Sequence, residues 1–327
     1  MSGAEELNPC FAVRQSAEWV LSQTQLVSID DGGIQQLAAS LADAAPHFSP
    51  ASFDRTLHFW DPAQPERVSQ YLLVLDALNF CFWPQEGLEY EHLAGGLRQA
   101  VQADPQALHA ERLATVDGPG VRRLLRQERP LPLEEERARL LREVGAALLD
   151  QYQGQAANLI QAAGQSAVRL VRLVTAVFRG FRDHCIYRGR QLFFYKRAQI
   201  FVGDVWGAFH GAGLGRFTDI DQLTMFADYR VPVVLRELGV LRYAPSLAAA
   251  VDAKQELAPG SQEEVEIRAA TVVAVERLRG ELQRRLAAEG RQAPHLCSVT
   301  LDWWLWEEGE RNIQRHRPHH RTLTIHY

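Results

Sequence analysis

Two lysines stand out in this sequence because nearly every other basic side chain is an arginine. Of 35 lysine and arginine residues, only Lys196 and Lys254 are lysines. If residues 189–209 form one long helix, Phe193, Lys196 and Ile200 share one face of it. A lysine on an apolar face is costly unless its ammonium group meets an anion. The segment therefore predicts a clamp for a phosphate or carboxylate group, or a side chain that reaches solvent or pairs with a local aspartate.

A carboxylate at a predicted helix start is the second chemical candidate. Asp228 lies in the string Ala227-Asp-Tyr-Arg-Val-Pro232, and we expect a helix over residues 228–238 that Gly239 ends. An aspartate in this position commonly caps the first backbone N–H groups. The helix dipole at the same position favours an ionised carboxylate facing a reacting centre. Both interpretations stay open, and one side chain can serve both.

Aromatic side chains gather in two earlier segments. His47 and Phe48 open a stretch up to residue 62 that has no helical period, and Asn79-Phe-Cys-Phe-Trp-Pro84 follows a helix expected over residues 68–78. Such a group of rings with one amide would suit a pocket for a flat ring, which the rings stack on and the amide hydrogen-bonds. The alternative is an ordinary aromatic core at a helix end.

The C-terminal part contains two more unusual segments. Asp302-Trp-Trp-Leu-Trp306 has three tryptophans within four positions. They cannot all face one core, so we expect at least one of them in an aromatic lid or in a subunit contact. The segment from Arg311 to Arg321 is rich in arginine and histidine, which suits either polyphosphate binding or a solvated basic surface. Its histidine spacing matches no zinc pattern.

The elements that must position these residues are predominantly helical. Apolar residues recur at three- and four-residue spacing among helix-forming residues, which predicts a mainly α, multi-helical fold with little strand. The clearest helix covers residues 261–288 and begins with a capping box of Ser261 and Glu264. Further expected elements are helices over 11–24, 34–45, 91–102, 133–152 and 166–181, a surface connection over 117–132 and one strand over 320–327. The length of 327 residues suits one catalytic unit, or two helical lobes (about 1–132 and 133–327) with the site between them.

Composition and charge exclude several classes of protein. Hydrophobic residues make up 46% and charged residues 23%, which excludes a disordered chain. The net charge of -5 argues against a protein that holds duplex DNA by charge alone. The four cysteines are far apart and form no CxxC pair, so we expect free thiols in a reducing compartment. No signal peptide or transmembrane segment is visible, which predicts a cytoplasmic protein.

Several strings, taken in order, resemble one family, the queuosine salvage proteins, which are queuosine 5'-phosphate N-glycosylase/hydrolases. The resemblance covers roughly residues 10–327 and departs from the family over residues 104–132, which are rich in arginine and proline. The strings are Asn79-Phe-Cys-Phe-Trp-Pro84, Phe181-Arg-Asp-His-Cys185, Phe194-Tyr-Lys-Arg-Ala-Gln-Ile200, Leu223-Thr-Met-Phe-Ala-Asp-Tyr-Arg-Val-Pro232 and Asp302-Trp-Trp-Leu-Trp306.

The resemblance implies hydrolysis of the N-glycosidic bond of queuosine 5'-monophosphate, which releases queuine for reuse in tRNA. It also implies a fold similar to the helix-hairpin-helix DNA glycosylases, in which a lysine and an aspartate from two helices flank the sugar. Asp228 would then be the catalytic carboxylate that stabilises an oxocarbenium-like transition state, and Lys196 would meet the 5'-phosphate. Because a 7-deazapurine lacks N7, Asn79 or Asp76 would hydrogen-bond its pyrimidine edge. The remaining implied substrate contacts are Phe82, Trp83, His47, Phe48, Tyr229, Arg230, Asp302 and Trp303.

We further expect a monomer that needs no metal or other cofactor and forms no stable complex with nucleic acid or membrane. Two alternatives remain at this stage. A helix-hairpin-helix DNA glycosylase would need a basic groove as wide as DNA and would bind duplex measurably. A non-enzymatic helical binding module would use the tryptophan segment to dock a partner protein.

Overall fold

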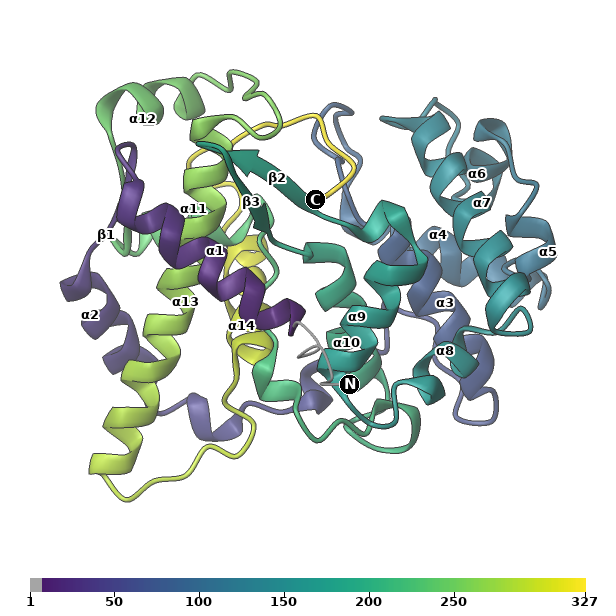
Figure 1. Cartoon of the computed structure of the whole chain (residues 1–327), viewed down its shortest axis with the longest axis horizontal. Coiled ribbons are helices and arrows are strands. Elements are labelled where there is room, and N and C mark those ends of the chain that lie inside the picture. The colour runs from purple at the N-terminus through teal and green to yellow at the C-terminus, as the bar shows by residue number, and fades with distance from the viewer. Residues whose placement is uncertain (1–7) are drawn as a thin grey trace, which may run out of the picture. The chain divides into compact units, whose positions relative to one another are not determined.

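The computed structural model describes residues 8–327 of the chain (Figure 1). This described part contains fourteen α-helices and two small antiparallel sheets, which confirms the mainly α prediction. Residues 1–7, part of the stretch on which the signal-peptide expectation depends, lie outside the described residues. No helix within residues 8–327 has the length and apolar character needed to cross a membrane. All four cysteines are free thiols, as predicted.

The chain forms two compact units, each assembled from separate segments. Unit 1 consists of residues up to 49, 184–196 and 221–323, and unit 2 of residues 50–183, 197–220 and 324–327. The expected lobe boundary near residue 132 falls inside unit 2. The chain passes from unit 1 to unit 2 within helix α10 (Lys196–Ala208), directly after its first residue.

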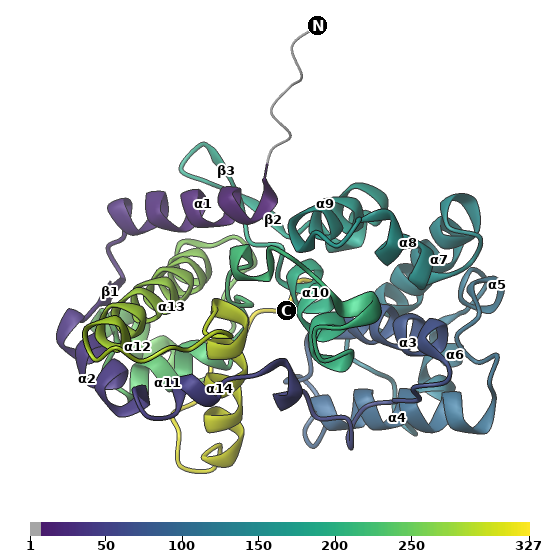
Figure 2. The ribbon, with the colours of Figure 1, turned by 90° about the horizontal axis from the view of Figure 1, so that it is seen from below.

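Unit 1 is organised around one long helix, α13 (Gln262–Ala288). Its residues from Glu264 to Val275 are all buried, because α1, α2, α11 and α14 pack around it (Figure 2). As predicted, Ser261 caps this helix by accepting the Glu264 N–H, at 3.4 Å. The other elements of unit 1 are α1 (Pro9–Gln23), β1 (Val27–Ile29), α2 (Asp31–Leu41), η1 (Ala45–His47), β2 (His184–Tyr187), β3 (Arg190–Phe193), α11 (Val231–Glu237), β4 (Leu241–Tyr243), α12 (Pro245–Asp252) and α14 (Ser298–Arg311).

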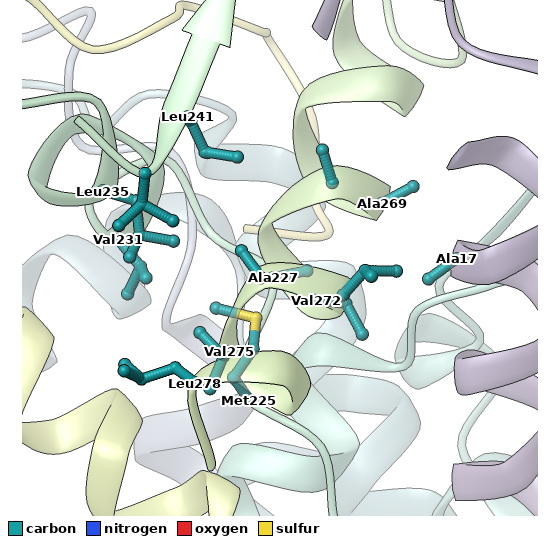
Figure 3. Packing of buried hydrophobic residues seen from close by; sticks show 14 of the residues in the cluster. Ala17, Met225, Ala227, Val231, Leu235, Leu241, Ala269, Val272, Val275 and Leu278 are labelled. Carbon is teal, nitrogen blue, oxygen red and sulfur yellow. The ribbon is translucent and has the colours of Figure 1, made fainter. Parts of the chain in front are cut away.

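The apolar core of unit 1 anchors the segment that carries the string around Asp228. Met225 and Ala227 lie against Val272 and Val275 of α13, and Val231 continues the same layer (Figure 3). Full burial of a side chain such as Met225 is worth about 1.5–3 kcal/mol relative to exposure. The backbone on both sides of Asp228 is therefore fixed by packing.

Unit 2 is a helical assembly in which α7 packs against α3, α5 and α6, and α3 also contacts α4 and α8 (Figure 1). The α3 helix is buried over almost its whole length, which places its C-terminal end in the interior. The elements are η2 (Pro50–Ser52), α3 (Pro65–Leu78), α4 (Tyr90–Ala103), α5 (Ala110–Leu113), α6 (Gly118–Leu124), α7 (Glu134–Gln151), α8 (Ala156–Ala162), α9 (Ala167–Val177), η3 (Arg179–Phe181), the remainder of α10, and η4 (Gly213–Gly215); η5 (Ile220–Gln222) lies at the boundary of the two units.

The prediction of one helix over residues 189–209 was wrong in its first part. Residues Arg190–Phe193 form β3, which pairs with β2 in a hairpin. The hairpin turns at Arg188 and Gly189, whose φ angles are +49° and +75°, and Tyr195 with φ +53° separates β3 from α10. A short apolar run fits a strand as well as a helix, so periodicity alone did not separate them. Phe193 and Lys196 consequently do not share a helix face.

Two further predictions of elements were also wrong. The expected surface connection over 117–132 contains α6, whose start is capped by Asp117 through the Gly120 N–H at 2.7 Å. The strand expected over residues 320–327 is absent from the described structure of that segment, where one isolated bridge joins Glu256 and Arg321. Alternation over so few residues is a weak signal without a partner strand.

Candidate functional site

Asp228 lies in a turn that leads into α11. Its Oδ1 accepts hydrogen bonds from the backbone N–H groups of Arg230, at 2.9 Å, and Val231, at 3.1 Å. The helix begins at Val231, three residues later than predicted, with Arg230 as its N-cap residue. Asp228 thus satisfies backbone donors at a helix entrance, as the capping interpretation requires, and its side chain is half-buried.

The electrostatic surroundings of Asp228 act in two directions. Burial raises the pKa of the Asp228 carboxyl above its usual value, because water no longer solvates the ionised form. The positive charge of Lys196, the two backbone N–H groups and the charge of Arg230 each favour the ionised form. Lys196 is only 4% exposed. The structure therefore places both predicted reactive residues, Lys196 and Asp228, in unit 1. The positive charge of Lys196 favours the ionised form of the Asp228 carboxylate.

Asp302 and Arg268 hold the backbone immediately before Asp228. Asp302 on α14 accepts the Phe226 N–H at 2.9 Å, and Arg268 on α13 donates its Nε–H to the Ala227 carbonyl at 3.0 Å. Both side chains are buried. Hydrogen bonds to charged groups contribute about 1.5–3 kcal/mol each, so this pair restrains the position of the carboxylate strongly.

Arg268 was missed from the sequence. It lies over the ring of Phe194 at 4.1 Å and approaches Glu264 at 3.3 Å. The sequence contained one signal for Arg268, namely an arginine between apolar residues of the long helix. Burial of such a charge costs free energy unless the side chain has hydrogen-bond or ion-pair partners. Asp302, which was expected to contact the substrate, is seen here to contact the backbone of Phe226.

Tyr229 and Arg230 connect Asp228 to the basic C-terminal segment. The Tyr229 ring stacks on His319, with centroids 4.4 Å apart and planes at 28°. Arg230 places its Nε 2.9 Å from Glu310 Oε1. Burial lowers the pKa of His319 to about 4, and the nearby charges of Arg230 and other cations add to the effect. His319 is therefore neutral near pH 7 and acts as a flat stacking partner.

The other candidates in unit 1 are less enclosed. His47 is exposed, Phe48 packs partly against the core, and Trp303 is half-buried on α14. Trp303, Trp304 and Trp306 all keep part of their surface exposed, and Trp304 also packs against the core of unit 1. That at least one of them lies in an aromatic lid or in a subunit contact stays a prediction.

The expected base-binding residues lie in unit 2. Asp76 is fully buried near the end of α3, Asn79 and Phe82 are 6% and 5% exposed, and Trp83 is half-buried. Trp83 packs against a small cluster that includes Phe80. The structure thus gathers these four predicted residues at one end of α3.

Two buried arginines shape this segment, and the sequence did not reveal them. Arg137 on α7 donates to the carbonyls of Leu78 at 2.7 Å, Phe80 at 2.6 Å and Cys81 at 3.0 Å. Arg197 on α10 donates to the Ala77 carbonyl at 2.7 Å. Each is 1% exposed, and burial lowers the pKa of Arg197 to about 10. The side chains of Arg137 and Arg197 therefore donate to main-chain carbonyls, and these hydrogen bonds fix the turn after α3.

Comparison with known proteins identifies similar sequences along the whole chain. The family described as "Queuosine salvage protein" matches residues 57–327. The chain is 41% identical to the queuosine 5'-phosphate N-glycosylase/hydrolase of Dictyostelium discoideum, over 98% of this chain and 100% of that protein. It is 44% identical to the protein of the same name from Sphaerobacter thermophilus, over 94% and 95% of the two chains. The Mus musculus protein of that name is 34% identical over 98% and 100%.

Proposed function

The chain belongs to the queuosine salvage protein family, and on this basis we propose that it hydrolyses the N-glycosidic bond of queuosine 5'-monophosphate. The products are queuine, available for return to tRNA, and ribose 5-phosphate. The resemblance seen in the five motif strings is confirmed by the sequence identities of 41% and 44% to these relatives, which extend over nearly the full length of the chain. The structural observation that supports the proposal is the Asp228 carboxylate, held by two backbone donors and acted on by the Lys196 charge.

The proposed mechanism follows from the charge that develops on the sugar. Cleavage of the bond builds positive charge on the ribose in an oxocarbenium-like transition state. A fixed carboxylate beside the anomeric carbon stabilises that charge without having to reorganise. Asp228 would also accept a proton from the attacking water, a task for which a pKa raised above that of a free aspartate is better suited. The Lys196 charge and the backbone donors favour the ionised form of this half-buried carboxylate.

We propose Lys196 as a substrate contact beside this carboxylate, on the side of the ribose phosphate. Tyr229 and Arg230 follow Asp228 directly, and we propose that both contact the sugar phosphate. We propose Asp302 and Trp303 on α14 as further residues of the site. Asp302 would act mainly by holding the backbone of the segment before Asp228. His47 and Phe48 are proposed to contribute to the edge of the site.

For the base, we propose contacts from the turn after α3. Phe82 and Trp83 would stack on the 7-deazaguanine, and Asn79 or Asp76 would hydrogen-bond its pyrimidine edge. A leaving base without N7 cannot be protonated there, so stabilisation through the pyrimidine edge is the remaining route. Fixation of the turn by Arg137 supports this assignment, because a rigid backbone lowers the entropy lost on binding.

Incubation of the purified chain with queuosine 5'-monophosphate, followed by chromatography for queuine, tests the proposed function. We expect queuine to appear with the parent chain and to fall at least ~10²-fold in rate with Asp228→Asn. Guanosine 5'-monophosphate serves as a control for base specificity. Release of guanine at the same rate, or no release of queuine, would contradict the proposal.

We further propose that the enzyme works as a cytoplasmic monomer on the free nucleotide, with a fold of the helix-hairpin-helix glycosylase type. The names of the relatives favour a nucleotide hydrolase over the DNA glycosylase and binding-module alternatives. Size-exclusion chromatography with light scattering tests the monomer, and a gel-shift assay with abasic duplex tests the absence of a stable DNA complex.

A further inference from the structure

Residues 324–327, here called the terminal segment, belong to unit 2, although residues 221–323 before them belong to unit 1. Thr324 and Tyr327 are buried, with 7% and 2% of their surfaces exposed. The sequence suggested a strand here, and the mechanism proposed above uses none of these residues. The terminal segment is therefore a buried part of unit 2 that still lacks a role.

Two contacts join the terminal segment to the turn that follows α3. The backbone N–H of Cys81 donates to the main-chain oxygen of Tyr327 at 3.0 Å. Ile325 packs against the small apolar cluster around Phe80 and Cys81, and Trp83 packs against the same cluster. Because Cys81 is fully buried, its N–H needs a partner within the protein. The terminal segment supplies such a partner.

This turn has a backbone conformation that depends on its surroundings. Asn79 has φ −78° and ψ 71°, and the Phe80 N–H donates to the Leu78 carbonyl at 2.9 Å, which together form an inverse γ-turn. Cys81 follows with φ +49°, in the left-handed region that costs free energy for a residue with a side chain. Such a conformation persists where the surrounding structure holds it in place.

Cys81 is held at both of its main-chain polar groups. Its carbonyl accepts from Arg137 at 3.0 Å, and its N–H donates to Tyr327, also at 3.0 Å. Phe82 and Trp83, the proposed stacking partners of the base, follow directly in the chain. The conformation of Cys81 therefore sets the direction in which the backbone enters these two residues.

We propose that the terminal segment is a positioning element for base binding. It holds Cys81 in the left-handed conformation, and thereby orients Asn79 before it and Phe82 and Trp83 after it. A turn that is fixed in advance loses less conformational entropy when the base binds. The proposal rests on the proposed function and deepens it, because it names a part of the chain that prepares the base site without touching the base.

The test uses a chain that ends at Thr324 and the point variant Ile325→Ala, with Leu323→Ala as the matched control. Leu323 lies two positions before Ile325 and is 40% exposed, and both substitutions remove the same number of carbon atoms. The shortened chain loses both contacts, whereas Ile325→Ala loses only the packing. Calorimetric titrations with queuine and with ribose 5-phosphate are made well below the midpoint of thermal unfolding of each variant.

We expect the dissociation constant of queuine to rise about tenfold in the shortened chain, and by a smaller factor in Ile325→Ala. The dissociation constant of ribose 5-phosphate should stay within about twofold of the parent, because the sugar phosphate does not depend on the turn. Leu323→Ala should match the parent for both ligands. Hydrogen exchange over residues 78–84, measured by mass spectrometry without ligand, should be faster in the shortened chain, because the Cys81 N–H has lost its acceptor.

Unchanged queuine affinity in the folded shortened chain would overturn the proposal, even with a lower unfolding midpoint, because the segment would then only stabilise the fold. If the shortened chain does not fold, Ile325→Ala decides, and queuine affinity equal to that of Leu323→Ala overturns the proposal. Unchanged hydrogen exchange over the turn would also contradict it. If the parent neither releases nor binds queuine, the proposed function fails, while the exchange measurement still decides whether the terminal segment fixes the turn.

Discussion

Replacement of Asp228 by asparagine separates a catalytic carboxylate from a capping one. The Oδ1 atom accepts two backbone N–H groups, from Arg230 at 2.9 Å and Val231 at 3.1 Å. Asparagine keeps an oxygen in that position, and it caps helices about as well as aspartate. We therefore expect Asp228→Asn to fold, with at most a small change in the midpoint of thermal unfolding. Asp228→Ala loses both hydrogen bonds and should be less stable by about 1–3 kcal/mol.

Catalysis should respond very differently from stability. Asparagine carries no charge, so it neither stabilises a cationic ribose nor accepts a proton from water. We expect the turnover of queuosine 5'-monophosphate by Asp228→Asn to fall at least ~10²-fold, which corresponds to about 2.7 kcal/mol of transition-state stabilisation. Binding of the nucleotide, measured by calorimetry, should persist.

The pH dependence provides a second measurement on the same residue. Only the ionised carboxylate is active, so the rate should rise as pH increases through the pKa of Asp228. Since burial raises that pKa, the acid limb of the parent should lie above the pH at which a free aspartate titrates. Turnover by Asp228→Asn within a few-fold of the parent, with the same acid limb, would refute the reasoning and leave Asp228 as a cap.

Three further perturbations address other parts of the site. Lys196→Met should move the acid limb of kcat/KM to higher pH, because the Lys196 charge lowers the pKa of Asp228; an unmoved limb in the pH–rate profile would show that this charge does not control the carboxylate. Trp83→Ala should weaken queuine binding about ten- to a hundredfold, since stacking on a base contributes ~1–3 kcal/mol; an unchanged affinity by calorimetry would exclude Trp83 from the base site. Arg137→Met removes the donor for three buried carbonyls and should destabilise the fold by at least ~3 kcal/mol in urea unfolding, whereas Arg139→Met, more exposed on the same helix, should cost less than ~1 kcal/mol. Equal losses of unfolding free energy in the two variants would mean that the buried N–H donors of Arg137 do not stabilise the fold.

Much of the helical architecture followed from the sequence. The helix α13 was predicted almost to the residue, since Ser261 caps it and its period is long. The position of Asp228 at a helix entrance was also visible, although the helix begins three residues later. Caps and periodicity depend on neighbours within a few positions of the chain, so a sequence read by itself contains them.

The hairpin of β2 and β3 shows where such local reasoning fails. A run of four residues fits a strand or a helix, and the choice between them depends on the partner strand and on the residues that turn with positive φ. The same run therefore led to a wrong helix face for Lys196. What Lys196 meets was decided by the packing of unit 1, which brings it near a carboxylate 32 positions further along the chain.

The sequence by itself determined the helical class, the caps and the residue types capable of glycosidic chemistry. Only the tertiary structure decided which of them act together: that Arg268 and Asp302 hold the backbone before Asp228, and that His319 stacks on Tyr229. These contacts join segments tens of residues apart, where no periodic pattern or local cap constrains the pairing. Burial of the side chains and pairing of their charges stabilise these contacts. Both exist only once the chain has folded.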